Sequence, residues 1–287
     1  MIGPVVRRIS SSIFVGRVVE RAQLEAGLDE AGRSDPGLVL LGGEAGIGKT
    51  RLVSELTTMA GSRGALVVRG HCLDAKAASM PFAPFIEILR GLLLGQPAPV
   101  DVGAEEPGRS ALYRLVPEIE PQPAAERRPA TEDERVRLFY AVLGLFGRTA
   151  MDRSLVVVIE DLHWADASSL DLLKFIAGGL SDERLLVLGT FRSDELHRRH
   201  PLVPLLGEFV RLPHVMRLDL PAFTEPEVAD QLTGIAGSRP TDDVVERVFA
   251  RSDGNPFFVE ELAGRDADAR LPATLRDVLA NHWLYIE

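Results

Sequence analysis

The octapeptide Gly43–Thr50 constrains the fold of this chain more than any other segment. It reads Gly-Glu-Ala-Gly-Ile-Gly-Lys-Thr and fits the pattern G-x-x-x-x-G-K-[ST]. The apolar run Leu38–Leu41 precedes it, and Lys49–Ala60, which carries apolar residues at helical spacing, follows it. A glycine-rich loop between a buried strand and a helix is the context that this pattern requires. The sequence therefore predicts an α/β fold in which this loop joins a strand to a helix.

The residue types of this loop predict its ligand. Glycines let successive backbone N–H groups turn inward as an anion-binding nest, at a helix N-terminus whose dipole also favours phosphate. We expect Lys49 to neutralise the β- and γ-phosphates of a nucleoside triphosphate, and the Thr50 hydroxyl to coordinate Mg²⁺. The alternative is an ordinary glycine-rich turn. The predicted ligands are ATP or ADP with Mg²⁺, bound by Gly43, Glu44, Ala45, Gly46, Ile47, Gly48, Lys49, Thr50 and Arg51.

Five short apolar runs predict the strands of a sheet. Most of them are continuously apolar, as is typical of strands that are covered on both faces of a parallel sheet. Helical segments lie between them, and strand alternating with helix indicates right-handed crossovers. The sequence therefore predicts a parallel five-stranded sheet. The runs are Leu38–Leu41, Ala65–Arg69, Leu155–Ile159, Leu185–Phe191 and Met216–Leu220.

The predicted domains are an N-terminal tail at 1–13, an α/β domain at 14–220 and a helical lid at 221–270. Within the α/β domain, 91–130 is rich in Pro, Ala, Gly and Glu, which predicts a mobile, loop-rich insertion with Leu112–Val116 as its apolar patch. The lid is predicted from three helical patterns, at Glu225–Leu232, Asp242–Ala250 and Pro256–Ala263. Start signals for predicted helices are Thr131 with Glu134, Ser168 with Asp171, Thr224 and Thr241, and Gly178-Gly179 is a predicted stop.

The predicted strand Leu155–Ile159 ends in two adjacent acids, Glu160 and Asp161. Burying one carboxylate beside another is costly unless a cation or hydrogen-bond donors compensate, so this strand end suggests a Mg²⁺ site. One acid would hold the metal through water while the other polarises the attacking water, and the sequence leaves their assignment open. The alternative is that both merely mark a solvated strand end. The predicted metal ligands are Thr50, Glu160 and Asp161.

Four segments of the chain share their residues with one class of proteins. They are Gly43–Thr50, Glu160–Asp166, Gly189–Arg192 and Gly254–Phe257. Together they resemble the AAA-type ATPase module of the STAND class, most closely that of the large ATP-binding regulators of the LuxR type. The resemblance runs from about residue 14 to about residue 279 and implies an AAA-like P-loop NTPase sheet followed by a helical lid. It also implies that 271–287 begins a truncated winged-helix-like segment.

The resemblance assigns roles to further residues. Val15, Gly16 and Arg17 are similar to a motif that lies against adenine, and Pro256 is similar to a lid proline that packs against the base. Arg192 looks like a sensor of the γ-phosphate, a role that suits a guanidinium because it stays charged and offers fixed donors. Plainer alternatives are a helix-entry turn, a Gly-Asn-Pro turn and a surface arginine. The implied catalytic residues are Asp161, Glu160, Lys49 and Arg192.

Composition excludes several classes of partner. The 32 Lys and Arg against 42 Asp and Glu give a net charge of −10, which disfavours direct DNA binding by this chain. The apolar runs are far shorter than the roughly 20 residues of a membrane-spanning helix. A single cysteine, Cys72, excludes an internal disulfide, and His71-Cys72 is a poor metal pair without further ligands. A cytoplasmic location is the expectation.

The resemblance implies a regulatory switch in signalling or transcription. ATP and Mg²⁺ would bind between the α/β domain and the lid, and slow hydrolysis would reset the lid. The expected partners are the nucleotide and a protein partner or a second copy of the chain. Whether the chain hydrolyses ATP stays open at this point. The alternatives are a constitutive ATPase that remodels a protein partner, a non-hydrolysing module that titrates full-length relatives, and phosphoryl transfer to a small acceptor.

Overall fold

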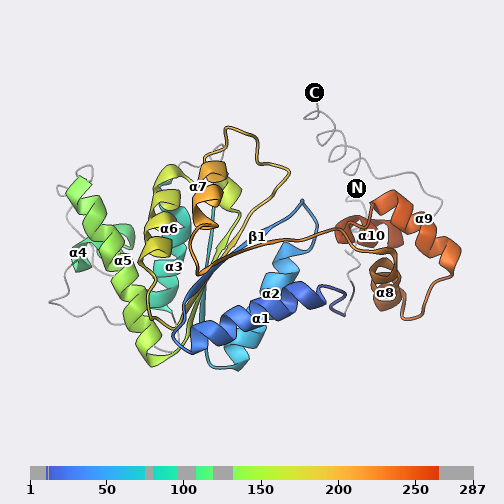
Figure 1. Cartoon of the computed structure of the whole chain (residues 1–287), viewed down its shortest axis with the longest axis horizontal. Coiled ribbons are helices and arrows are strands. Elements are labelled where there is room, and N and C mark those ends of the chain that lie inside the picture. The colour runs from blue at the N-terminus through green and yellow to red at the C-terminus, as the bar shows by residue number, and fades with distance from the viewer. Residues whose placement is uncertain (1–10, 12, 75–79, 96–107, 119–131, 265–287) are drawn as a thin grey trace, which may run out of the picture. The chain divides into compact units, whose positions relative to one another are not determined.

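The structure is a computed structural model that describes residues 11, 13–74, 80–95, 108–118 and 132–264 (Figure 1). These residues fall into two compact units, which are described separately here. The sheet unit is formed by Glu20–Gly42 and Val53–Asp219. The lid unit is formed by the described residues of Met1–Val19, Gly43–Leu52 and Leu220–Glu287. The glycine-rich loop thus groups with residues from both ends of the chain, whereas the sequence assigned it to the α/β domain.

The strands of the sheet unit are β1 (Gly37–Gly42), β2 (Leu66–His71), β3 (Leu155–Glu160), β4 (Leu185–Thr190) and β5 (Val215–Asp219). They form one parallel sheet in the order β2-β3-β4-β1-β5, which confirms the predicted five-stranded parallel sheet. Every residue of β3 and β4 is buried, and this explains why both segments are apolar without alternation. The carboxyl ends of β3 and β4, at Glu160 and Thr190, lie at the same edge of the sheet because neighbouring strands run parallel.

Helices cover both faces of this sheet (Figure 1). Leu38 and Leu40 of β1 pack into a core with side chains from the helices on one face, and between them Val39 approaches Gly27 on the other face. This alternation follows from the strand geometry, in which successive side chains point to opposite faces. The helices up to β5 are α1 (Val18–Gly32), α2 (Lys49–Ser62), α3 (Ala83–Leu94), α4 (Arg109–Leu115), α5 (Glu132–Asp152), α6 (Ala167–Gly179) and α7 (Leu202–Phe209), with a 3-10 turn, η2, at Leu162–Trp164.

The predicted cap of α6, Ser168, is wrong, and the helix starts two residues earlier than that cap implies. The cap is Asp166, whose carboxylate accepts hydrogen bonds from the backbone N–H groups of Ser168 at 2.9 Å and Ser169 at 3.1 Å. An aspartate two residues ahead of Ser168 satisfies the first free N–H groups of the helix, so no capping box with Asp171 is needed. The predicted stop at Gly179 is confirmed. The predicted cap Thr131 lies outside the described residues.

The predicted loop-rich insertion at 91–130 is partly helical. Helix α3 continues to Leu94, and α4 occupies the apolar patch that the sequence placed at Leu112–Val116. Leu92, Leu112 and Val116 are buried in the core, so these short helices are held by packing that composition did not reveal. The stretches 96–107 and 119–130 lie outside the described residues.

The lid unit contains α8 (Glu225–Ala236), α9 (Asp242–Ser252) and α10 (Pro256–Ala263), at the positions predicted for three helices. Thr224 caps α8 in a capping box, because the carboxylate of Glu227 accepts from its backbone N–H at 2.8 Å. The three helices and the N-terminal residue Val15 share a small apolar core. Most of the predicted tail at 1–13 (residues 1–10 and 12) and the whole of the predicted winged-helix-like segment at 271–287 lie outside the described residues.

In the described part of the chain, no helix combines the length and the apolar character needed to cross a membrane.

Candidate functional site

The glycine-rich loop begins with two carbonyl groups that bind its own lysine. The Nζ of Lys49 donates to the backbone oxygens of Gly43 at 2.6 Å and Glu44 at 2.8 Å. Lys49 is only 8% exposed, so its ammonium is held inside the loop. A buried ammonium needs such oxygen partners, and phosphate oxygens would serve it better because charge-assisted hydrogen bonds are about twice as strong.

The next three carbonyls of the loop bind other segments of the lid unit. The oxygen of Ala45 accepts from Asn255 Nδ2 at 2.9 Å, and that of Gly46 accepts from the backbone N–H of Phe257 at 3.3 Å. The oxygen of Ile47 accepts from Arg17 Nη2 at 3.1 Å. Five successive carbonyl groups, Gly43–Ile47, are therefore committed to the protein. In a nest, this arrangement leaves the opposite face of the loop to the N–H groups that bind an anion.

Three glycines in the loop, Gly43, Gly46 and Gly48, have backbone angles that other residues rarely adopt, and the last two differ in their surroundings. Gly46 has φ +78°, and a Cβ built on it would lie 2.7 Å from the Cβ of Phe257. Gly48 has φ +103°, and a Cβ built there would meet no described atom within 4 Å. Gly46 thus permits close contact with α10, while Gly48 borders open space. Both features fit a cradle for a phosphate chain.

The side chain of Asn255 both caps α10 and binds the glycine-rich loop. Its side-chain Oδ1 accepts from the N–H of Phe257 at 3.1 Å and caps α10, while its Nδ2 reaches Ala45. Sequence reasoning placed Asn255 in a recognisable Gly-Asn-Pro element but gave it no role. The signal that could have indicated one is an Asn directly before a Pro at a helix start, which is a cap position.

We expect Asn255→Ala to lower the free energy of unfolding by about 1–2 kcal/mol, because it removes a helix cap and leaves the Ala45 carbonyl without its donor. Urea denaturation followed by circular dichroism measures this change. Thr241→Ala is the control, since Thr241 is the N-cap of α9 without a side-chain cap hydrogen bond and its hydroxyl donates to the exposed side chain of Asp243. If Asn255→Ala lowered the free energy of unfolding no more than the control does, the role of Asn255 in joining α10 to the loop would be contradicted.

The residues predicted to lie against adenine also belong to the lid unit. Val15 is buried in the lid core, and Gly16 packs so closely on α8 that a Cβ there would lie 2.2 Å from Glu227 Oε1. Arg17 is buried, with its guanidinium 4.8 Å from the centre of the Phe223 ring. Pro256 is the first residue of α10. The lid unit therefore brings the predicted phosphate-binding and base-binding residues together.

Arg51 and Thr50 follow the loop in α2. The guanidinium of Arg51 donates to the carbonyl oxygens of Ser11 at 2.8 Å and Ile13 at 2.6 Å, and it lies 3.9 Å from Glu260. The side chain of Arg51 thus binds the N-terminal segment. The group of Arg51 that we expect to contact a nucleotide is its backbone N–H. Thr50 is exposed, and a hydroxyl must be accessible in order to coordinate a metal ion.

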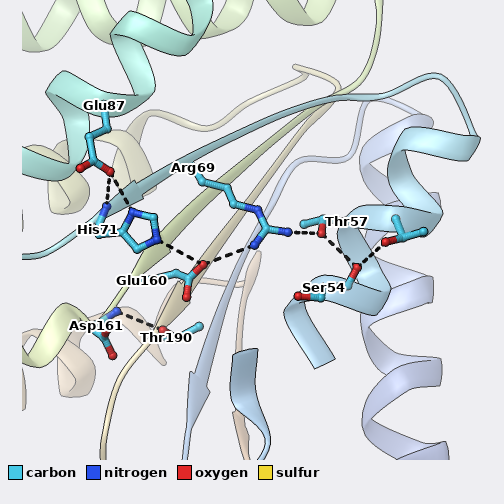
Figure 2. Close-up of polar contacts among 9 residues, drawn as sticks. Ser54, Thr57, Arg69, His71, Glu87, Glu160, Asp161 and Thr190 are labelled. Carbon is cyan, nitrogen blue, oxygen red and sulfur yellow. Dashed lines mark hydrogen bonds and ion pairs between the residues drawn. The ribbon is translucent and has the colours of Figure 1, made fainter. Parts of the chain in front are cut away.

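In the sheet unit, the carboxylate of Glu160 at the end of β3 lies beside the side chains of Arg69 and His71 from the neighbouring strand β2 (Figure 2). Its Oε1 lies 3.5 Å from Arg69 Nη1 and 3.7 Å from His71 Nε2. Arg69 also donates to the Thr57 hydroxyl on α2, and His71 Nδ1 lies 2.9 Å from Glu87 on α3. With Glu160 only 7% exposed, the Arg69 guanidinium supplies the positive charge that burial of this carboxylate demands.

Asp161 differs from its neighbour in exposure and in backbone conformation. Its side chain is 32% exposed, and its φ of +61° places it in the left-handed region, which Asp tolerates better than most residues. Its backbone N–H donates to the Thr190 hydroxyl at 3.1 Å, at the end of β4 (Figure 2). The two predicted acids are thus held in different environments, because Glu160 is buried beside Arg69 whereas the side chain of Asp161 is about a third exposed.

These acids fit Mg²⁺ in the chemistry of their donors, because Mg²⁺ prefers carboxylate and water oxygens. Among the residues that the structure covers, no group of three or more His, Cys, Asp and Glu side chains is arranged to hold a metal ion by itself. Mg²⁺ commonly takes only one or two carboxylates and completes its shell with water and substrate phosphates. Burial and, next, the charge of Asp161 raise the pKa of the Cys72 thiol, which favours its protonated form.

Arg192, the predicted γ-phosphate sensor, lies just beyond β4. Its Nη1 lies 2.5 Å from Glu195, and its guanidinium stacks 5.3 Å from the centre of the Trp164 ring. Its backbone N–H donates to Nδ1 of the buried His163 at 3.3 Å. His163 and Trp164 therefore pack the turn after β3 and support Arg192. The sequence did not indicate these contacts, nor the pairing of Arg69 with Glu160.

Comparison with known proteins places these features in context. A family model described as an AAA ATPase domain matches residues 13–188. No curated protein matches the chain. Among solved structures, the chain is similar to a signal transduction ATPase with numerous domains (STAND) that has a tetratricopeptide repeat sensor, from Pyrococcus horikoshii. That match has 13% identity and a TM-score of 0.48, and it covers 99% of this chain and 35% of the other.

Two further solved structures are similar over most of this chain. A mutant of RuvB from Thermotoga maritima matches at 16% identity with a TM-score of 0.47, covering 96% of this chain and 67% of the other. The Drosophila ORC bound to DNA matches at 14% identity with a TM-score of 0.47, covering 86% of this chain and 58% of the other. The chain spans about a third of the length of the Pyrococcus horikoshii STAND protein.

Proposed function

The chain belongs to the AAA ATPase domain family, and from this premise we propose that it is a nucleotide-dependent switch of the STAND class. It binds ATP or ADP with Mg²⁺ and hydrolyses ATP slowly. Its role is in signalling or transcriptional regulation, as in the LuxR-type regulators that its motifs resemble. It acts from the cytoplasm through a protein partner or through self-association, without contacting DNA itself.

The observation that carries this proposal is the direct link between the phosphate-binding loop and the lid. Asn255 and Phe257 at the start of α10 hold two carbonyls of the loop, while Lys49 holds two others. A phosphate chain on the N–H face would draw Lys49 away from these carbonyls, because an anionic oxygen is the stronger acceptor. The carbonyls of Gly43 and Glu44 would then lose this partner, and they directly precede the Ala45 and Gly46 carbonyls that position α10.

A ligand shifts such an equilibrium only as far as its affinities for the two states differ. ATP and ADP differ by the γ-phosphate, which we assign to Lys49 and Arg192. Both residues would lose a partner after hydrolysis, and the lid would relax to the state that the loop prefers with ADP. When bound, Mg²⁺ would neutralise phosphate charge, with Thr50, Glu160 and Asp161 as its candidate ligands.

Identifying the nucleotide that the purified chain carries tests this proposal. A switch should retain ATP or ADP through purification, and chromatography of the denatured protein would show the base and the number of phosphates. Turnover discriminates further, since a switch hydrolyses slowly whereas a remodelling ATPase turns over steadily and faster when assembled. A chain that carries no nucleotide and binds none when ATP and Mg²⁺ are added would contradict the proposal.

Arg192→Ala should narrow the preference for ATP over ADP by about tenfold, because a guanidinium that binds the γ-phosphate contributes only to ATP. Calorimetric titration with each nucleotide measures the two affinities. Arg198→Ala, at an exposed arginine of the same segment, is the control and should leave the ratio unchanged. If Arg192→Ala also leaves it unchanged, Arg192 is only the partner of Glu195 and Trp164.

A further inference from the structure

Two successive residues directly before α1 have left-handed backbone angles. Gly16 has φ +63° and Arg17 has φ +58°. A residue with a long side chain rarely adopts such an angle, and it keeps one only where its surroundings hold it there. The turn is packed closely on its glycine side, because a Cβ built on Gly16 would lie 2.2 Å from Oε1 of Glu227, a residue of the capping box of α8. The contact with α8 therefore fixes the point at which the Arg17 side chain leaves the backbone.

The guanidinium of Arg17 is covered by protein and bonded to the glycine-rich loop. Arg17 is 6% exposed, and its guanidinium carbon lies 4.8 Å from the centre of the Phe223 ring, which belongs to the lid core. Its Nη2 donates to the carbonyl oxygen of Ile47 at 3.1 Å. A guanidinium stays charged when it is buried, so this hydrogen bond is charge-assisted and stronger than one between neutral groups. The contacts of this side chain are therefore with the loop and the lid core.

The bond to Ile47 also sets the direction of the next N–H group. The carbonyl of Ile47 and the N–H of Gly48 belong to one planar trans peptide, in which the two groups point in opposite directions. Because Arg17 holds the carbonyl, the Gly48 N–H is directed to the other side of the loop. Gly48 stands directly before α2, and its own carbonyl accepts from the N–H of Leu52 at 3.1 Å. An N–H group fixed at this place is suited to bind a phosphate oxygen.

We propose that Arg17 is a positioning residue of the glycine-rich loop, which holds the Ile47 carbonyl so that the Gly48 N–H is aimed at a bound phosphate. This inference rests on the proposed function, because it takes the loop as the phosphate site. It gives the Arg17 side chain a role different from the contact with adenine that the resemblance implies. In this role Arg17 supports the binding of a triphosphate whether or not a base is attached. Its positive charge favours the same anion.

The test compares ATP with ribose 5′-triphosphate, which carries the same phosphates without a base. Both affinities are measured on the purified full chain with Mg²⁺, by displacement of labelled ATP. Arg17→Met keeps the apolar length of the side chain but removes its charge and its donors, and it should weaken both ligands by the same factor of about ten. Arg17→Lys keeps the charge and a donor, and it should return both affinities to within about threefold of the unmodified chain.

Two controls separate this role from the stability of the lid and from surface charge. Val245→Ala removes packing from the same lid core without removing the hydrogen bond to Ile47. It should lower the midpoint of urea unfolding and leave both affinities within about twofold of the unmodified chain. Arg21→Met removes an exposed arginine that pairs with Glu25 on α1, and it should change neither the midpoint nor the affinities.

The outcomes separate this inference from the proposed function. If the unmodified chain binds neither ligand, the proposed function fails. If Arg17→Met leaves both affinities unchanged, or weakens ATP alone, Arg17 does not position the loop, and the inference is overturned while the proposed function stands. The inference is also overturned if Val245→Ala weakens both ligands as much as Arg17→Met does, because the loss then reflects the stability of the lid. Should Arg17→Met fail to fold by circular dichroism, Arg17→Gln replaces it, and its losses should again be equal for the two ligands.

Discussion

Lys49→Ala is expected to weaken ATP binding at least about a hundredfold, as measured by isothermal titration calorimetry. The side chain is buried in the loop and already occupies a position bounded by the carbonyls of Gly43 and Glu44. A charge held there has lost most of its water, so its attraction to a phosphate chain is screened less than that of a surface lysine. Replacing it removes both the charge and the donors.

Lys174→Ala is the matched control, because Lys174 is exposed on α6 and pairs with Glu208. It should bind ATP like the unmodified chain. Circular dichroism should show that Lys49→Ala keeps the sheet, since the strands and their core do not include Lys49. An ATP affinity unchanged by Lys49→Ala would remove the central claim that this loop binds the phosphates.

Asp161→Asn should reduce the rate of ATP hydrolysis about a hundredfold or more while changing the ATP dissociation constant less than about threefold. Asp161 is the more exposed of the two acids and the one without an arginine partner among the described contacts. We therefore assign it to polarising the attacking water. Asparagine tolerates the left-handed backbone at this position as well as aspartate does, so the substitution removes the charge without straining the turn. Phosphate release and calorimetry measure the two quantities.

Glu160→Gln provides the contrast for this experiment. Glu160 is the buried acid and our candidate for the Mg²⁺ ligand. Its replacement should therefore weaken Mg²⁺-dependent binding of ATP as well as ATP turnover. It also leaves Arg69 without a carboxylate partner, which should lower stability. Equal losses of affinity and rate in Asp161→Asn would mean that the roles of the two acids were assigned wrongly.

The sheet could be predicted from sequence because its three central strands, β1, β3 and β4, are buried on both faces and apolar. The edge strands β2 and β5 are less buried and contain charged residues, but each still has enough apolar residues to be recognised, and the observed strands differ from the predicted ones only at their ends. The phosphate-binding loop was equally visible, because its glycines and lysine stand at fixed spacing between a strand and a helix. Helices α1, α3, α4 and α7 were missed, since packing stabilises them more than local signals do.

The contacts that give the candidate site its character join residues far apart in sequence. Asn255 reaches Ala45 across 210 residues, and Arg69 reaches Glu160 across 91. No local pattern specifies which carbonyl an asparagine will bind or which acid an arginine will neutralise. The cap Asp166 was missed for a related reason, because Ser168 also fits the pattern of a cap and only the geometry of the turn after β3 decides between them.

The partners of the loop carbonyls also bear on the order in which the chain matures during its synthesis. The loop is complete in sequence by residue 50, yet the donors for Ala45 and Gly46 come from Asn255 and Phe257. While the ribosome is still making the C-terminal helices, the nascent loop lacks these two partners. Competence to hold a nucleotide in the final geometry is therefore acquired late, once the last helix of the lid has emerged.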